Sequence, residues 1–314
     1  MPDVTRFVGI DVAMDKLDVH IHPSGETFAV PNTVAGVRRI AGRWEPGTVM
    51  ALEASGGYER TAAEGLAMAG LTLYCLHPAD VRAFARLAGS RAKTDRIDAA
   101  LIARAAEVAM ISRKPYCARP AAADVKEMAA CRRLLLSQLA ALKGQATRLA
   151  TQTMRALMNR QITALQSNIR HIDQTMAQRI AQNPELDETA TRIQTAPGAG
   201  PVLAATLVAY LPEIGTLTSR QAASLVGVAP HPRQSGKSNR PGRCQAGRAP
   251  VRSVLYMATL AAIRCKTSQL GRFFERLRGN GKPFKLAMVA TMRKFIVMLN
   301  AMIKHRKDWT DQIA

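Results

Sequence analysis

Apolar and polar positions follow two different periods along the first third of the chain. Runs rich in β-branched and aromatic residues predict five strands, at residues 7–12, 17–22, 27–30, 49–54 and 71–77. Amphipathic stretches predict helices at 34–44, 58–69, 79–87 and 95–108. Three opening strands joined as hairpins, followed by alternating helices and strands, predict a mixed sheet with helices packed on it. Residues 1–112 are therefore expected to form an α/β domain.

The apolar spacing changes to a heptad between about residues 120 and 182. One seam steps by four and three through Leu135, Leu139, Leu142, Ala146, Leu149, Thr153 and Ala156. A second seam, one residue out of phase, contains Ile162, Leu165, Ile169, Ile172 and Met176. The change of phase predicts a break near residues 159–161. We therefore expect two long helices forming a coiled coil within 113–186, with a helical hairpin packed inside one chain as the alternative.

The remaining residues, 187–314, combine helical patterns with two segments rich in glycine and proline. Residues 195–201 predict a turn whose glycines let backbone amides approach a phosphate closely. Residues 227–243 are polar and basic, and we predict a functional loop there. Helical patterns resume at 250–263 and 283–304. The expected C-terminal domain is mainly helical and carries a basic catalytic loop.

The charge of the chain points to a polyanionic partner. Lys and Arg number 44 against 23 Asp and Glu, which gives a formal net charge of +21. The excess is uneven, because no acidic residue occurs from Ile214 through Phe274. Such a concentration of cations on one part of a chain is typical of nucleic-acid binding.

The cysteines and the apolar runs bear on the compartment in which the protein works. The 5 cysteines are scattered and never form a CxxC pair, so neither a disulfide framework nor a zinc site is indicated. No basic-then-apolar signal pattern opens the chain, and no uninterrupted apolar run reaches the roughly 18 residues of a membrane span. We expect a protein of the reducing cytoplasm, associated with the nucleoid and without a membrane partner.

Four acidic residues occupy positions that suit metal binding. Asp11 and Glu53 each end an apolar strand, where burial of a carboxylate is costly unless it binds a cation. Asp95 and Asp98 lie three residues apart at the start of a predicted helix, on one face. Singly, each has an ordinary alternative, such as a helix cap or a solvated residue. Together they could hold two magnesium or manganese ions, as phosphoryl transfer requires.

A serine in the basic segment is a candidate nucleophile. Ser235 stands in a glycine- and proline-containing stretch, where serine normally serves turn geometry alone. Cationic residues surround it that could bind phosphate and stabilise a pentavalent transition state, namely Arg233, Lys237, Arg240 and Arg243. Ser238, three residues on, competes with Ser235 for this role.

These motifs resemble the Asp-Glu-Asp-Asp transposases of a bacterial insertion-sequence family. The resemblance rests first on Gly-Ile-Asp11-Val, Leu-Glu53-Ala-Ser-Gly-Gly-Tyr and Lys-Thr-Asp95-Arg-Ile-Asp98-Ala. It continues in Thr-Ala-Pro-Gly-Ala-Gly-Pro, Leu-Val-Gly-Val-Ala-Pro and Arg-Gln-Ser235-Gly-Lys, and so covers almost the whole chain in order. It implies a RuvC-like N-terminal domain, a ribonuclease-H-like fold that the predicted order of strands and helices also suits.

The resemblance further implies a composite catalytic site. Asp11, Glu53, Asp95 and Asp98 would bind magnesium, and Ser235 would attack the DNA phosphate and form a transient phosphoserine link. Domains of different subunits would complete each other's sites, so a homodimer or homotetramer is expected. A structured noncoding bridge RNA would pair with donor and target DNA, which leaves the protein mainly backbone contacts. The low aromatic content, 4%, fits limited base stacking.

Two other functions remain open from the sequence. A junction resolvase or related RuvC-like endonuclease would use the same four acids with water as the nucleophile, and would hydrolyse DNA without a covalent adduct. A non-enzymatic nucleic-acid-binding or assembly protein would need only the coiled coil and the basic surface. The presence of all four acids makes this the weakest of the three interpretations.

Overall fold

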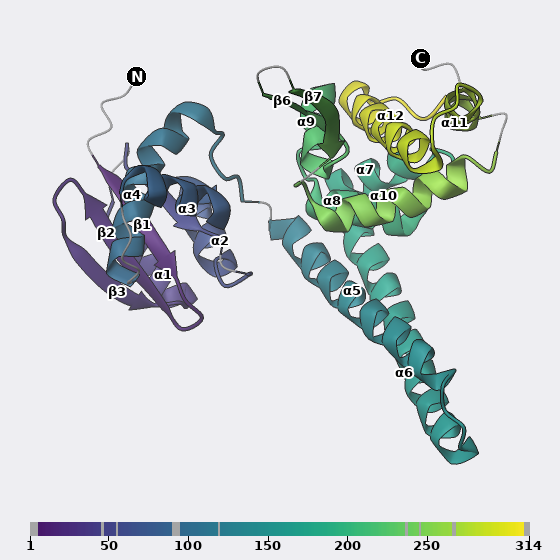
Figure 1. Cartoon of the computed structure of the whole chain (residues 1–314). Coiled ribbons are helices and arrows are strands. Elements are labelled where there is room, and N and C mark those ends of the chain that lie inside the picture. Colours follow the sequence, from purple (N-terminus) through teal and green to yellow (C-terminus); the bar gives the residue numbers. More distant parts are fainter. Residues whose placement is uncertain are drawn as a thin grey trace. The chain divides into compact units, whose positions relative to one another are not determined.

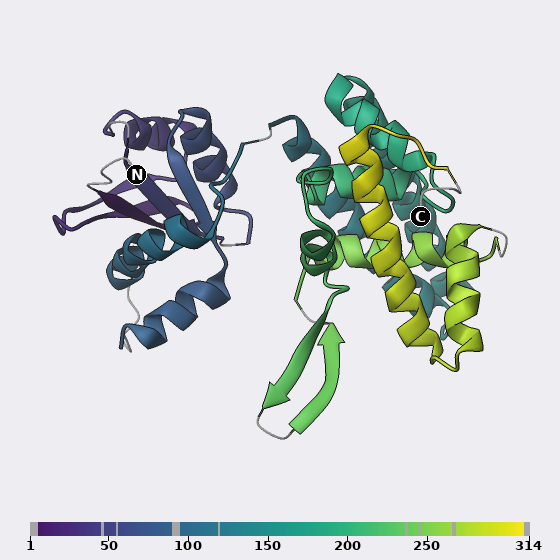
Figure 2. The same cartoon turned by 90° about the horizontal axis from the view of Figure 1, so that it is seen from above.

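The chain folds into two compact units, Met1–Pro120 and Ala121–Ala314. The structure is a computed structural model, and Figures 1 and 2 show both units. It describes residues 6–44, 47–54, 56–89, 95–118, 120–235, 238–244, 246–265 and 268–310. The division of the chain into 1–112, 113–186 and 187–314 remains a prediction.

The first unit is built on a five-stranded mixed sheet. Its strands are β1 (Phe7–Val12), β2 (Lys16–His22), β3 (Thr27–Pro31), β4 (Val49–Glu53) and β5 (Thr72–Leu76). The order across the sheet is β3-β2-β1-β4-β5. β1, β2 and β3 pair antiparallel, whereas β1, β4 and β5 pair parallel. All five predicted strands are confirmed, and the mixed sheet with them.

Helices cover both faces of this sheet. They are α1 (Val34–Ala41), α2 (Arg60–Met68), α3 (Pro78–Leu87) and α4 (Asp95–Ser112). One face packs α1 and α2 against inward residues of the strands such as Val8, Ile10 and Leu52. The other face, with Val49 and Ala51, packs α3 and α4. Because side chains alternate along a strand, residues 7, 9 and 11 of β1 and 49, 51 and 53 of β4 belong to this second face.

A glycine sets the close approach of α4 to the sheet. A Cβ atom on Gly9 would lie 2.0 Å from the carbonyl oxygen of Ala99 and 2.3 Å from the amide nitrogen of Ala103. Both alanines are buried in α4, whose sheet-facing side is rich in small residues. Only glycine at this position of β1 allows the helix backbone to lie so near the strand.

Two long antiparallel helices open the second unit, α5 (Pro120–Ala146) and α6 (Gln152–Ala181). Arg132 of α5 forms an ion pair with Asp173 of α6. Of the predicted heptad positions in α5 and α6, Leu139, Ile169 and Met176 are buried. Because the two helices belong to one chain, this arrangement matches the helical-hairpin alternative.

The predicted position of the helix break is wrong. The turn falls at residues 147–151 and not near 159–161, so Thr153 and Ala156 belong to the first turns of α6 and are exposed. Local polar bonds end α5 and begin α6: the Thr147 hydroxyl donates to the carbonyl of Gly144 at 2.9 Å, and the Arg155 guanidinium donates to the carbonyl of Ala150 at 2.6 Å. Such side-chain bonds to the backbone compete with the hydrogen bonds of a helix, so a helix can end even where the apolar heptad continues.

The rest of the second unit is a helical bundle with one small hairpin. Its elements are α7 (Pro184–Gln194), α8 (Pro201–Tyr210), α9 (Ser219–Val226), β6 (Pro230–Ser235), β7 (Ser238–Cys244), α10 (Ala249–Ala262), α11 (Gln269–Gly279) and α12 (Phe284–His305). Within the described ranges, α12 is the one helix long and apolar enough to cross a membrane, and 56% of that window is buried. It carries Phe295 and Leu299, which have no exposed surface, so we interpret α12 as the core helix of this bundle.

The predicted functional loop at 227–243 is largely a β-hairpin. β6 and β7 pair antiparallel, with Ser235 opposite Ser238 at the far end and Pro230 opposite Cys244 at the base. Gly236 and Lys237 lie outside the described residues. The sequence did contain a signal for this structure, because glycine followed by one residue between two extended runs is typical of a two-residue hairpin connection. The proline and glycine content of the segment favoured a loop over a hairpin in the sequence-based prediction.

Candidate catalytic residues in the two units

Asp11 and Glu53 occupy equivalent positions at one edge of the sheet. The parallel register between β1 and β4 pairs Phe7 with Val49 and continues to Ile10 with Leu52. One step further along both strands come Asp11 and Glu53, each partly buried. Residues level with each other on adjacent parallel strands project from the same face. Both acids therefore stand at the carboxyl edge of the sheet, on the face that α4 covers.

Helix α4 brings the third acid to this edge. The helix runs opposite to β1 (Figure 1), and its later turns share a core cluster with Phe7 and Val49 at the start of the strands. Its first turns therefore lie toward the carboxyl edge, with Ala99 against Gly9. Asp98 is partly buried and stands one turn before the fully buried Ile102. Asp98 thus continues the sheet-facing side of α4 toward the two strand-end acids.

Asp95 is the first residue of α4, and its side chain lies outside the described residues. Among the described side chains, no three His, Cys, Asp or Glu groups gather closely enough to hold a metal ion. The donor chemistry nevertheless fits a hard divalent cation, because every acid that α4 and the strand ends bring to this edge offers carboxylate oxygens. The four-acid site thus stays a prediction, and the fold supports it by placing three of the four positions at one edge.

The candidate nucleophile lies in the other unit. Ser235 ends β6 and is paired with Ser238, which begins β7. Of the predicted phosphate-binding residues, Arg233 of β6 is paired with Arg240 of β7, while their side chains and that of Ser235 lie outside the described residues. Lys237 lies outside them entirely. Arg243 is exposed near the base of the hairpin.

Two crossing glycines fix the base of this hairpin. Gly227 follows α9 with a φ of 78°, and Gly247 precedes α10 with the same φ, a left-handed conformation that favours glycine. A Cβ atom on Gly247 would lie 2.4 Å from the amide nitrogen of Gly227. The Arg252 guanidinium donates to the carbonyls of Val226 and Ala246, at 3.2 and 2.7 Å. The two ends of the hairpin segment are thus held together where they leave the helices.

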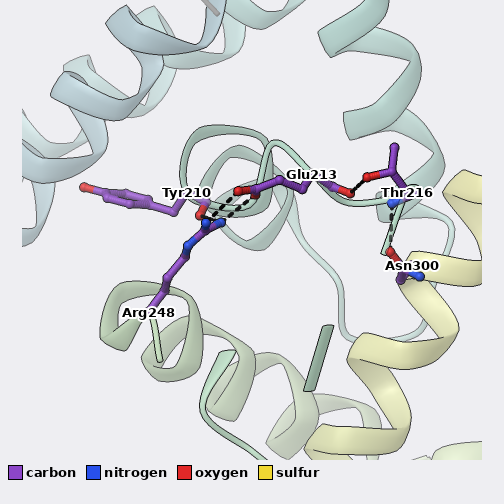
Figure 3. A network of polar contacts seen from close by, with 6 residues as sticks. Tyr210, Glu213, Thr216, Arg248 and Asn300 are labelled. Carbon is purple, nitrogen blue, oxygen red and sulfur yellow. Dashed lines mark hydrogen bonds and ion pairs between the residues drawn. The ribbon is translucent and has the colours of Figure 1, made fainter. Parts of the chain in front are cut away.

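A polar network continues this attachment into the bundle (Figure 3). The Arg248 guanidinium forms a bidentate ion pair with the Glu213 carboxylate, both contacts being 2.6 Å, and donates to the carbonyl of Tyr210 at 2.7 Å. The buried Asn300 of α12 accepts a hydrogen bond from the amide of Gly215 at 2.8 Å. Arg248 and Glu213 were not singled out from the sequence, because 35 residues separate them and neither belongs to a motif.

The glycine-rich turn at 195–201 joins α7 to α8, as predicted. Gly198 has a φ of 80°, and a Cβ there would lie 2.4 Å from the carbonyl of Ala258 in α10. Gly198 therefore serves close packing within the bundle. Gly200 has open space beside it and caps α8, and the approach of a phosphate to this turn stays a prediction.

Models of known protein families match two parts of the chain. The model described as "Transposase IS116/IS110/IS902 family" matches residues 190–275, and the DEDD-type IS110 model described as "Transposase" matches residues 8–155. Among curated proteins, the "Pilin gene-inverting protein" of Moraxella bovis is 26% identical over 328 residues. The protein of the same name from Moraxella lacunata is also 26% identical. Each match covers 98% of this chain and 98% of the relative.

Proposed function

The chain belongs to the IS110/IS116/IS902 family of insertion-sequence transposases, and on this premise we propose that it cuts and rejoins DNA strands through a covalent phosphoserine intermediate. Transposases process DNA, so the broad class of activity follows from the family. The nucleophile, the metal and the guide are the parts that we propose.

The observation that carries the proposal is the alignment of Asp11 with Glu53 at the carboxyl edge of the sheet. The β1/β4 register aligns Asp11 with Glu53, and the direction of α4 brings Asp98 toward them. Together with Asp95 at the first position of α4, these residues would hold magnesium or manganese. The bound metal would neutralise charge on the entering and leaving oxygens of the phosphoryl transfer.

Ser235 would act as the nucleophile in a balanced exchange of phosphate esters. Its hydroxyl loses a proton and its oxygen bonds to phosphorus, while the bond from phosphorus to one deoxyribose oxygen breaks and that oxygen takes up a proton. In the second step, a deoxyribose hydroxyl of the new strand attacks the phosphoserine and the serine oxygen regains its proton. Each step replaces one phosphodiester bond with another, so no external energy source is needed.

The basic residues of the hairpin would bind the DNA around this serine. Arg233 and Arg240 occupy paired positions on β6 and β7, and Lys237 and Arg243 extend the positive charge along the segment. Guanidinium and ammonium groups bind phosphate and stabilise charge that develops in the transition state. We further propose that a bridge RNA selects donor and target DNA by base pairing. The cations of the hairpin would then contact the phosphate backbone and not the bases.

Asp11, Glu53 and Asp98 lie in one compact unit of the chain, and Ser235 lies in the other. We propose a homodimer or homotetramer in which the two units of different subunits complete each site. The exposed apolar residues of the helical hairpin, Leu134, Met154 and Leu157, support an intermolecular contact there. The name of the Moraxella relatives refers to gene inversion, which conserves DNA strands and so supports rejoining rather than hydrolysis.

A covalent adduct tests the mechanism directly. Purified protein is incubated with magnesium, DNA and the noncoding RNA of its element, and the products are separated on a denaturing gel. We expect an adduct with the wild type and with Ser238→Ala, and none with Ser235→Ala. Ser238 is the matched control because it is paired with Ser235 in the same hairpin. Free cleaved ends without an adduct would identify a water-using endonuclease instead.

A further inference from the structure

Away from the proposed catalytic residues, we propose that Arg276 and Lys294 form a binding site for a backbone phosphate of duplex nucleic acid. The site lies between α11 and α12, and Phe273 is its apolar floor. It is separate from the serine hairpin and the carboxylate edge, and nothing in the family assignment points to it.

Two cations lie at the ring of Phe273. The Lys294 ammonium nitrogen lies 4.9 Å from the centroid of the Phe273 ring, and the guanidinium carbon of Arg276 lies 5.3 Å from the same centroid. Phe273 and Arg276 stand one turn apart on α11, whereas Lys294 comes from α12. A partly buried ring thus gathers cations from two helices at one place.

The two cations have no acidic partner among the described residues. Glu275 is the single acidic residue from Ile214 to Lys307, and no ion pair joins it to Arg276 or Lys294. Burial, and then the charge of Arg276, lower the pKa of Lys294. Two like charges held together without a counterion are unfavourable, and an anion between them would offset the repulsion of both.

The surroundings favour a phosphate of a duplex over an unstacked base. Phe273 is partly buried and has cations at its ring, so it offers no free platform on which a base could stack. Exposed arginines extend the positive surface on both helices, with Arg272 one turn before Arg276 and Arg293 next to Lys294. Several cations around one apolar side chain suit the closely spaced phosphates of a duplex backbone.

Salt-dependent binding tests the site without requiring catalysis. The full-length protein is titrated, without magnesium, with a DNA duplex of about three helical turns and an RNA duplex of the same sequence at several salt concentrations. Each lost phosphate contact should reduce the slope of log K against log salt by about 0.9 for DNA. We expect this reduction for Arg276→Gln and for Lys294→Gln, and about twice as much for the double variant.

The matched control is Lys285→Gln, because Lys285 is exposed and lies nine residues before Lys294, on the opposite side of α12. Lys294→Arg keeps the charge and should keep the slope, which separates charge from packing if Lys294→Gln is poorly folded. A reduced slope with DNA, with RNA or with both supports the site and identifies the nucleic acid it binds. Slopes equal to that of Lys285→Gln with both probes would overturn it, and the serine mechanism would be unaffected.

Discussion

Asp11 and Glu53 stand level with each other at the carboxyl ends of two neighbouring parallel strands, one step beyond the paired Ile10 and Leu52. The two residues are 42 positions apart in the chain, and the register of β1 and β4 alone aligns them. Both belong to the sheet face against which α4 packs, so a cation bound there would also be within reach of the first turns of that helix.

Replacing either strand-end acid should remove catalysis while leaving the fold intact. For Asp11→Asn and Glu53→Gln we expect strand exchange to fall by about a hundredfold or more, because a carboxylate ligand of the metal that would stabilise the transition state is lost. Magnesium binding, measured by calorimetry, should weaken in both variants. Asp15→Asn is the control, since Asp15 is an exposed turn residue of the same sheet. An Asp11→Asn protein with full activity would rule out the metal site.

Gly9→Ala should separate α4 from the sheet. The added methyl group would meet the backbone of Ala99 and Ala103, so we expect a loss of about 1–3 kcal/mol in the free energy of unfolding and a larger proportional loss of activity. Chemical denaturation measures the first and strand exchange the second. Gly144→Ala in α5 is the control, because nothing lies within 4 Å of the methyl group it would add and alanine favours a helix by about 1 kcal/mol. Equal stability of Gly9→Ala and wild type would contradict the close approach.

The ion pair between Arg248 and Glu213 should position the serine hairpin. Their side chains are 31% and 39% exposed, so solvent screening limits the coupling energy in a double-mutant cycle to about 1 kcal/mol. We expect Arg248→Ala to slow formation of the covalent adduct more than it weakens DNA binding, because Arg248 follows β7 by four residues and joins the base of the hairpin to Tyr210 and Glu213. The comparison pair is Arg43 with Glu26, which is 43% and 51% exposed and belongs to the first unit. Equal effects of both pairs on adduct formation would argue against a positioning role.

Tyr116 should make the first unit less stable at high pH. Burial, followed by the nearby Cys75 and Glu64, raises the pKa of Tyr116 from 10.0 to about 12. Its stabilising contribution is therefore complete below pH 10 and is lost as the pH rises from 10 toward 12, because the unfolded chain loses this proton first. Since the side chain is partly exposed, we expect the loss to be on the order of 1 kcal/mol. Unfolding curves between about pH 8 and 11 should show a smaller decline for Tyr116→Phe than for the wild type.

Local patterns in the sequence were sufficient for the strands and most helices. The five strands of the first unit follow runs of β-branched and aromatic residues, and α10 and α12 begin and end within a residue or two of the predicted helices. The period of apolar residues directly reflects which side of an element is buried, so it can be detected without knowing the partner. The apolar period does not show where a helix ends, and this explains the misplaced break between α5 and α6. There a continuous heptad runs across a turn that local hydrogen bonds determine.

The sequence by itself determined the alternation of strands and helices, the family motifs and the concentration of positive charge after Ile214. Only the tertiary structure decided which of these residues stand together. The direction of α4 and the register of β1 with β4 bring Asp98 toward Asp11 and Glu53, and Gly227 crossing Gly247 holds the hairpin of Ser235 to the bundle. The aromatic ring of Phe273 joins cations from two helices in the same way. Contacts between residues far apart in the chain depend on the packing of whole elements, and no local pattern of residues encodes that packing.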